Sequence, residues 1–354
     1  MSKIVSAGTC DSEYKLTQKE AKEFVYNLFS DSGVNIDRMI SIFDNSTVTG
    51  RHISAPLEWF KCKHSFPERN EMFIKSAIDI SEGAINECLE KANADVKDVD
   101  YMIFVTSTGI ATPSIDAFLI DRMKFNRHIK RTPIWGLGCA GGAAGLSRAM
   151  EFTKAYPGKT CLLVAVELCS LTFQKDDLSK SNIIATSLFS DGAAAVFIAG
   201  DESKFASAGN IKLIDSLSTM YYGSLDIMGW DLNDNGLKIV FSRDIPTIVR
   251  EYVRANIQEI IDIHGLKIED IKHYVSHPGG MKVIAAYESS LGTTNGEFNY
   301  SKKVLNEHGN MSSPSVLYVL KEFLMGNKFG NEELGLITAL GPGFSSEILL
   351  FKTE

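Results

Sequence analysis

The sequence predicts an α/β fold, in which buried strands alternate with amphipathic helices along the chain. Two observations lead to this prediction. Continuous apolar runs of strand length recur, and stripes of apolar residues at helical spacing lie between them. No low-complexity segment or obvious linker interrupts the alternation. Such a pattern is typical of a sheet covered by helices.

Local signals indicate the helices. Thr17 and Glu20 have the pattern of a capping box, and apolar residues follow them at helical spacing. A second apolar stripe covers residues 73–88. A third covers residues 248–261 and should end at Gly265, because glycine readily adopts the left-handed conformation that closes helices.

Apolar runs predict strands that are buried on both faces over residues 102–105, 162–166, 193–198 and 334–339. The first five residues also have the pattern of a strand, without the apolar core of a signal peptide. No stretch of about 18 uninterrupted apolar residues occurs. We therefore expect a cytoplasmic protein without a membrane span.

Composition argues against several classes of protein. With 354 residues, of which 44% are hydrophobic, the chain can bury a large core as one domain or as two similar halves. The formal net charge of -8 argues against nucleic acid as a partner, because nucleic-acid binding requires a basic stripe. The six cysteines contain no C-x-x-C pair, which indicates neither a zinc ribbon nor a disulfide framework. We expect reduced thiols and no metal.

Cys139 is the strongest candidate for a nucleophile. It follows a short apolar run at 133–135, which predicts a buried strand, and precedes helix-forming residues at 143–156. A cysteine at the start of a helix faces the positive end of the helix dipole, which lowers its pKa from ~8.5 into the range of about 3.5–7.5. We therefore expect a resting thiolate. A buried structural cysteine in a Gly- and Ala-rich turn is the alternative.

Two further polar residues stand where a strand or loop leads into a helix. His277 follows the strand-like run at 271–276 and precedes a Pro-Gly-Gly turn. Asn310 lies shortly before a helix whose first turn suits Pro314. Taken separately, His277 could merely hydrogen-bond its turn, and Asn310 could merely cap its helix.

Together, Cys139, His277 and Asn310 suit carbon–carbon bond formation through a thioester. Such chemistry needs a nucleophile that carries an acyl group and two neutral donors that stabilise an enolate oxygen. A cysteine protease of the papain type uses the same three residue types in the same order. Its nucleophile, however, lies near the mature N-terminus in a C-G-[SA]-C-[WY] context, whereas Cys139 lies mid-chain within Gly-Cys-Ala-Gly-Gly. The sequence therefore favours a condensing enzyme over a hydrolase.

The chain resembles a known family, the type III polyketide synthases of the chalcone synthase superfamily. Within that family it resembles the Bacillus-type alkylpyrone synthases most. The Pro-Gly-Gly turn after His277 differs from the Gln-Ala-Asn of ketoacyl synthase III enzymes. The resemblance covers nearly the whole chain as an ordered set of motifs at 106–114, 135–142, 167–173, 188–195, 277–280, 309–313 and 341–344.

The resemblance implies a thiolase-like αβαβα five-layer fold with two structurally duplicated halves. Residues 1–205 would form the half with the nucleophile, and residues 206–354 the half with the histidine and the asparagine. It implies that Cys139 accepts an acyl group from CoA, and that His277 and Asn310 stabilise the enolate formed when malonyl-CoA loses carbon dioxide. CoA thioesters would be the substrates, with no separate cofactor, and the protein would be a homodimer.

The resemblance also assigns residues to substrate binding. Phe189 matches the gatekeeping phenylalanine, while small side chains at Thr112 and Ile239 would open an apolar channel. Trp230 would fill the space that a folded aromatic tetraketide needs. Arg38 matches a cation that holds the CoA phosphates, and Arg51 and Lys282 are weaker candidates for that role. The other expected substrate-binding residues are Ser107, Cys169, Thr172, Ser312, Gly279 and Gly280.

Compared with plant chalcone synthases, the resemblance places smaller side chains at Thr112 and Ile239 and a larger one at Trp230. These three differences favour aliphatic starters. We expect condensation of a medium- or long-chain fatty acyl-CoA with malonyl-CoA, giving triketide or tetraketide alkylpyrones. The alternatives are an aromatic starter, a resorcinol-forming closure, or a condensing enzyme like ketoacyl synthase III. A homologue that binds acyl-CoA without catalysis is the alternative from another functional class, the binding proteins.

Overall fold

The structure is a computed structural model that describes residues 1–30, 36–242, 245–293, 296–326 and 329–354. Its strands are β1 (Ser2–Asp11), β2 (Tyr14–Thr17), β3 (Gly50–Ile53), β4 (Tyr101–Thr106), β5 (Lys130–Trp135), β6 (Thr160–Leu168), β7 (Asp191–Gly200), β8 (Ile211–Met220), β9 (Met228–Asn233), β10 (Gly236–Phe241), β11 (Ile271–Ser276), β12 (Leu334–Gly341) and β13 (Ser345–Thr353). Its α-helices are α1 (Gln18–Phe29), α2 (Ile36–Asp44), α3 (Leu57–Phe60), α4 (Phe66–Lys91), α5 (Ile115–Arg122), α6 (Gly141–Ala155), α7 (Lys180–Leu188), α8 (Ile245–Ile263), α9 (Met281–Leu291), α10 (Asn299–His308) and α11 (Ser313–Gly326).

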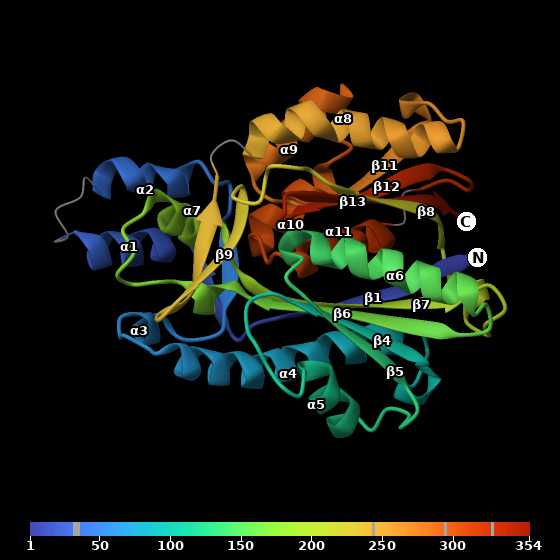
Figure 1. Ribbon diagram of the computed structural model, residues 1–354, viewed down its shortest axis with the longest axis horizontal. Coiled ribbons are helices and arrows are strands. Elements are labelled where there is room, and N and C mark those ends of the chain that lie inside the picture. The colour runs from blue at the N-terminus through green and yellow to red at the C-terminus, as the bar shows by residue number, and fades with distance from the viewer. Residues whose placement is uncertain (31–35, 243–244, 294–295, 327–328) are drawn as a thin grey trace.

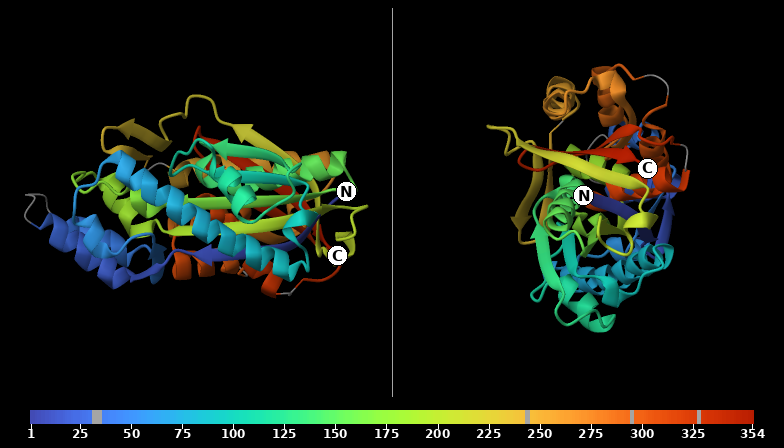
Figure 2. Two further views of the ribbon diagram at one scale, coloured as in Figure 1. Left: turned by 90° about the horizontal axis from the view of Figure 1, so that it is seen from below. Right: turned by 90° about the vertical axis from the view of Figure 1, so that its right-hand side faces the viewer.

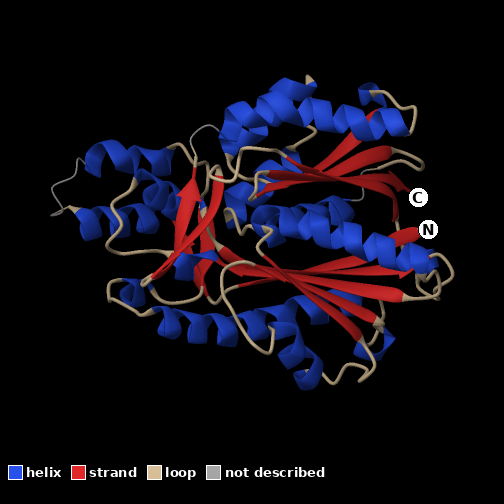
Figure 3. Ribbon diagram, in the orientation of Figure 1, coloured by secondary structure: helices blue, strands red, loops and turns tan. Residues whose placement is uncertain are grey.

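Helices and sheet stack in five layers, which confirms the αβαβα prediction (Figures 1 and 3). The middle layer holds α6 and α11, whose apolar residues pack in one core cluster with strands from both halves of the sheet. One outer layer is α4 and α5 against the first half, and the other is α8 and α9 against the second half. An apolar stripe on each helix faces the sheet, so burial of both sheet faces drives this arrangement.

The two halves of the sheet repeat one topology. Within the described residues, nine strands run in the order β11-β12-β13-β8-β1-β7-β6-β4-β5. In the first half, β1 pairs antiparallel with β7, β7 antiparallel with β6, and β6 parallel with β4. In the second half, β8 pairs antiparallel with β13, β13 antiparallel with β12, and β12 parallel with β11. The halves join where β1 pairs with β8. The domain boundary expected at 205 and 206 lies between β7 and β8 and stays a prediction.

Most elements agree with the local signals. The four apolar runs lie inside β4, β6, β7 and β12, and all their residues are buried except Leu334, which is half-buried. The capping box of Thr17 and Glu20 starts α1, and Gly265 adopts a φ of 64° just after α8. The helix expected from residue 143 begins two residues earlier, at Gly141.

The expectation of a buried strand at 133–135 is wrong. These residues belong to β5, which forms the edge of the sheet and pairs on one side with β4. Trp135 is 53% exposed, and its indole nitrogen donates to the Gly109 carbonyl oxygen at 3.1 Å. A short apolar run identifies a strand, but its neighbours in the sheet decide whether that strand is covered.

The elements outside the five layers gather at one end of the sheet. Helices α1, α2 and α7 and the β9–β10 hairpin lie at that end, and both chain termini lie at the opposite end (Figures 1 and 2). No helix among the described residues is long and apolar enough to cross a membrane. The cavities that contain the expected site residues take part of their lining from the β9–β10 hairpin at this end.

Candidate active site

Cys139 lies in a buried 3-10 turn, Gly138–Ala140, between β5 and α6. Glycine is required next to it: Gly138 has a φ of 46°, and a Cβ there would lie 2.7 Å from the Pro342 side chain. A Cβ on Gly142 would lie 2.3 Å from the Ser313 carbonyl oxygen. The Gly-rich sequence therefore lets the start of α6 approach the start of α11, which brings Cys139 close to the segment after Asn310.

The structure brings the three predicted catalytic residues to one cavity. Cys139, His277 and Asn310 line it together, from loops that follow β5, β11 and α10. Two halves of the chain contribute to this site, as expected from the sequence. The other lining residues are mostly apolar: Met228, Phe241, Ile245, Gly279, Val283, Tyr287 and Leu340.

His277 offers a neutral imidazole to this cavity. Its backbone N–H donates to the Thr338 carbonyl oxygen at 2.8 Å, which fixes the residue at the end of β11. Both ring nitrogens are buried and have no hydrogen-bond partner among the described residues. Burial lowers the pKa of His277 to about 3. The ring is therefore uncharged near pH 7 and can donate one hydrogen bond to a substrate oxygen.

Asn310 is held by its backbone so that its amide nitrogen stays available. Its N–H donates to the Leu188 carbonyl oxygen at 2.8 Å, and its own carbonyl oxygen accepts from the Ser190 N–H at 3.0 Å. Its Oδ1 accepts from the Ser312 N–H at 2.8 Å. The Nδ2 group makes one long contact, 3.5 Å to the Gly279 carbonyl oxygen. At that length the bond is weak, so Nδ2 can turn to a substrate oxygen.

The expected resting thiolate at Cys139 is wrong in this structure. Burial raises the pKa of the Cys139 thiol to about 12, although a hydrogen bond from the Ser312 hydroxyl opposes the rise. The charge of Glu167 raises it further. Ser312 reaches the sulphur because its own backbone has a φ of 58°. Desolvation is the largest cause of the raised pKa, and the buried, uncharged His277 adds no positive charge that would oppose it.

We expect the reactivity of Cys139 to reflect this raised pKa. Only the thiolate reacts with iodoacetamide, so the rate of Cys139 modification should keep rising by about tenfold per pH unit through pH 9. Peptide mass mapping over a pH series would measure it, with the exposed Cys62 as the internal comparison. A rate that levels off near pH 7 would instead indicate that the pKa of Cys139 is low and that its resting form is the thiolate.

Glu167 belongs to the site but was missed by the sequence analysis. It is fully buried behind Cys139, where its carboxylate accepts hydrogen bonds from the Ser107 N–H at 2.9 Å, the Thr108 hydroxyl at 2.8 Å and the Ser313 hydroxyl at 2.9 Å. Burial raises the pKa of Glu167 to about 7 despite these bonds. A carboxylate directly after the apolar run at 162–166 was the available signal, because buried acids are retained only where they are hydrogen-bonded.

A second, apolar cavity contains four of the ten expected substrate-binding residues. Cys169, Thr172, Phe189 and Ile239 line it together. Ile239 pairs with Trp230 across the β9–β10 hairpin, and the Trp230 ring meets the Phe189 ring edge-on at 6.4 Å between centroids. Further apolar side chains come from α1, α3 and the loop after β6: Ala21, Phe24, Leu57, Phe60 and Phe173.

An outer cleft adjoins the catalytic cavity. Gly279 and Phe241 line both, so the two spaces meet at these residues. Lys282 and Gly280, both expected near the substrate, lie on this cleft. Lys180, which the sequence analysis did not single out, lies there as well and adds a second cation.

Two sequence-based family descriptions match successive parts of the chain. The description of chalcone and stilbene synthases, N-terminal domain, matches residues 28–202, and that of the C-terminal domain matches residues 213–353. The chain belongs to the chalcone and stilbene synthase family. As a type III polyketide synthase of this family, it is a condensing enzyme of the acyltransferase type.

Similar proteins support this family over the full length. A Bacillus subtilis (strain 168) protein whose name places it with the chalcone synthases is 45% identical, covering 100% of this chain and 99% of its own length. The 1,3,6,8-tetrahydroxynaphthalene synthase of Streptomyces peucetius subsp. caesius is 32% identical, covering 99% and 92%. The crystal structure of the synthase of that name from Streptomyces coelicolor A3(2), a bacterial type III polyketide synthase, matches with a TM-score of 0.93, 27% identity and 99% of each chain.

Arg51 does not suit the CoA role expected for it in this type III polyketide synthase. Its side chain is 1% exposed, and its guanidinium donates to the Thr186 carbonyl oxygen at 2.6 Å and the Ser187 carbonyl oxygen at 2.7 Å. It also contacts the Gln18 side chain. Arg51 therefore supports the end of α7 from inside. The side chain of Arg38 lies outside the described residues.

Ser107 and Thr112 also differ from expectation. The Ser107 hydroxyl accepts from the Gly138 N–H at 3.0 Å, so it supports the Cys139 turn from behind instead of facing a substrate. Thr112 is exposed on the surface of the chain. A role of Thr112 in an acyl channel would need a second subunit, because on this chain its side chain faces solvent.

Proposed function

We propose that this type III polyketide synthase extends a medium- or long-chain fatty acyl-CoA with malonyl-CoA and releases triketide or tetraketide alkylpyrones by lactonisation. The observation that carries the choice of starter is the apolar cavity lined by Phe189, Ile239 and the phenylalanines of α1 and α3. The volume of this cavity is about 60 Å³, below the range of about 300–1,000 Å³ that is usual for ligand pockets. The apolar lining, and not the volume, therefore supports an aliphatic tail, and a long tail would need these side chains to move.

The residues of the catalytic cavity have complementary roles in this reaction. The Cys139 sulphur attacks the acyl-CoA carbonyl carbon. The thiol proton of Cys139 passes to the unpaired His277 ring and then to the departing CoA sulphur. Malonyl-CoA binds next, and His277 and the Asn310 amide donate hydrogen bonds to its thioester oxygen while carbon dioxide leaves. The resulting enolate attacks the acyl-Cys139 carbonyl carbon and releases Cys139 as a thiolate, which takes up a proton from water. Neutral donors in an apolar cavity stabilise this enolate strongly, because water does not compete for it.

Entry of CoA is proposed through the outer cleft. Its phosphates would meet Lys282 and Lys180 at the cleft, while the thioester reaches Cys139 past Gly279. Arg38 remains a candidate for the same role. No separate cofactor or metal takes part in the proposed condensation, since both reactants arrive as activated thioesters.

A homodimer in the cytoplasm is part of the proposal. Ile110, Phe118 and Trp135 are 45%, 37% and 53% exposed, and Trp135 contacts Gly109 in the segment that leads to Thr112. Covering these side chains with a second copy would remove apolar surface from water. It would also give Thr112 a buried setting.

A synthase with an aromatic starter or a resorcinol-forming closure is the second candidate. The relatives named 1,3,6,8-tetrahydroxynaphthalene synthase and 3,5-dihydroxyphenylacetyl-CoA synthase support it, since their names indicate aromatic products. The edge-on contact of Trp230 with Phe189 narrows the space beside Phe189. A narrow space favours a thin aliphatic tail over an aromatic ring.

The product spectrum decides between these candidates. Purified protein should be incubated with isotope-labelled malonyl-CoA and acyl-CoA starters from acetyl to stearoyl, together with aromatic starters, and the products analysed by mass spectrometry. We expect pyrones with alkyl tails of medium or long length. Products formed only from malonyl-CoA or from aromatic starters would contradict the proposed starter while leaving the family unchanged.

Enlarging Ile239 to phenylalanine should shorten the preferred starter. The larger ring would fill part of the apolar cavity, and each excluded methylene would forfeit roughly 0.8 kcal/mol of burial. We expect kcat/KM to fall more for long starters than for short ones, measured by malonyl-CoA consumption over a starter series. Ile263→Phe, at the exposed last residue of α8, is the matched control. An unchanged length profile with an intact fold would place the acyl tail elsewhere.

A further inference from the structure

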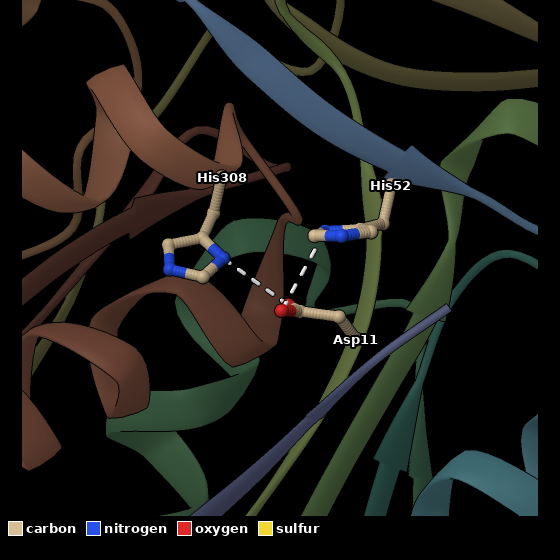
Figure 4. A group of neighbouring side chains, drawn as sticks. All are labelled: Asp11, His52 and His308. Carbon is tan, nitrogen blue, oxygen red and sulfur yellow. Dashed lines mark hydrogen bonds and ion pairs between the residues drawn. The ribbon is translucent and has the colours of Figure 1, made fainter. Parts of the chain in front are cut away.

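Asp11, His52 and His308 form a cluster outside the catalytic cavity, and none of them lines that cavity. Asp11 ends β1, His52 lies in β3 and His308 ends α10, so the three come from segments far apart in the sequence. Both imidazole rings point toward the Asp11 carboxylate (Figure 4). The His308 Nδ1 lies 3.1 Å from the Asp11 Oδ1, and the His52 Nδ1 lies 3.5 Å from the Asp11 Oδ2.

We propose that Asp11, His52 and His308 bind a divalent transition-metal ion of the zinc class. One ligand atom from each residue lies within 4.8 Å of the other two. Zinc binds imidazole nitrogen and carboxylate oxygen at about 2.0–2.2 Å with tetrahedral geometry, which separates neighbouring ligand atoms by roughly 3.5 Å. The distances of 3.1 and 3.5 Å are close to that separation, but they go to different oxygens of Asp11. A rotation of the carboxylate and a small closing of the two rings would bring one oxygen and both nitrogens around one ion.

The surroundings of the cluster suit a metal ligand set better than two simple ion pairs. The His52 Nδ1 is buried and has no hydrogen-bond partner within the described ranges, so its lone pair or proton is unused. The Tyr318 hydroxyl donates to the Asp11 Oδ1 at 3.0 Å and so orients the carboxylate, as groups around metal ligands do. Ser190 holds His52 by accepting from its N–H and donating to its carbonyl oxygen, both at 3.0 Å.

The site is open enough to exchange an ion. The side chains of Asp11, His52 and His308 are 32%, 17% and 22% exposed. Three protein ligands leave a fourth position to water, and two nitrogens with one carboxylate oxygen prefer zinc, cobalt or nickel to magnesium or calcium. An ion here would tie β1 and β3 to the end of α10, two residues before Asn310.

Metal binding can be tested without any activity assay, so its failure is distinct from failure of the proposed function. Tag-free full-length protein, stripped with a chelator, should be titrated with Zn²⁺ by calorimetry and with Co²⁺ by visible absorption. We expect one ion per chain, a d–d spectrum typical of four-coordinate Co²⁺, and a higher melting temperature with Zn²⁺.

His52→Asn is the decisive variant, because His52 Nδ1 makes no hydrogen bond among the described residues and loses only its 3.5 Å approach to Asp11. Together with Asp11→Asn and His308→Gln, it should weaken Zn²⁺ binding by at least about 10-fold and remove the Co²⁺ spectrum. His264→Gln is the matched control, since His264 Nε2 lies 3.0 Å from the Asp215 Oδ2 at a site with no second histidine ligand. Zn²⁺ binding that survives His52→Asn, or that falls equally in His264→Gln, would overturn the proposal.

Discussion

Replacing Cys139 with serine is expected to abolish chain extension, with a loss on the order of 10⁴-fold or more. A serine alkoxide is much harder to form than a thiolate, and the neighbouring base is weak because burial lowers the pKa of His277 to about 3. Turnover should be measured as malonyl-CoA consumed and as product formed. Serine is smaller than cysteine but similar in shape, so the fold of the turn at Gly138–Ala140 should be retained.

Intact-mass analysis tests the same assignment directly. Wild-type protein with an acyl-CoA starter should gain one acyl group on Cys139, and the Cys139→Ser protein should gain none. Cys62→Ser, at an exposed cysteine, is the control that should behave as wild type. An acyl group found on the buried Cys161 or Cys169 would show that the nucleophile is misassigned.

Replacing Asn310 with alanine should separate acyl loading from decarboxylation. The Asn310 amide is expected to act on the malonyl thioester oxygen, whereas loading needs only Cys139 and His277. We therefore expect acylation of Cys139 to persist while malonyl-CoA decarboxylation falls by ~10²-fold or more, as when one oxyanion donor is lost. Acyl adducts by mass spectrometry and release of labelled carbon dioxide measure the two steps separately.

Asn310→Asp distinguishes this role from structural support. Aspartate keeps an oxygen that accepts from the Ser312 N–H, which asparagine does at 2.8 Å, but it loses the donating amide. It should therefore lose decarboxylation while the turn at Ser312 is kept, and any fall in melting temperature measures the cost of burying the carboxylate. If loading and decarboxylation fall together in both variants, Asn310 serves the turn before α11 and not the reaction.

The sequence by itself determined the elements and the identity of the catalytic candidates. Apolar runs and stripes correspond to β4, β6, β7 and β12 and to α1, α4 and α8, because each pattern records which faces of one element are covered. The ordered motifs around Cys139, His277 and Asn310 were sufficient to predict that they meet, since each stands at the end of a strand or loop that opens into a helix.

Tertiary structure alone decided the environment of these residues. The pKa of Cys139 is raised because segments distant in sequence bury it and Glu167 lies behind it, and no local pattern reports that desolvation. Arg51 is inside the protein for the same reason. The burial of a side chain and the charges near it depend on all the neighbours that the fold brings together. The meeting of Asp11 with His52 and His308 follows from how β1, β3 and α10 pack, which their sequences do not state.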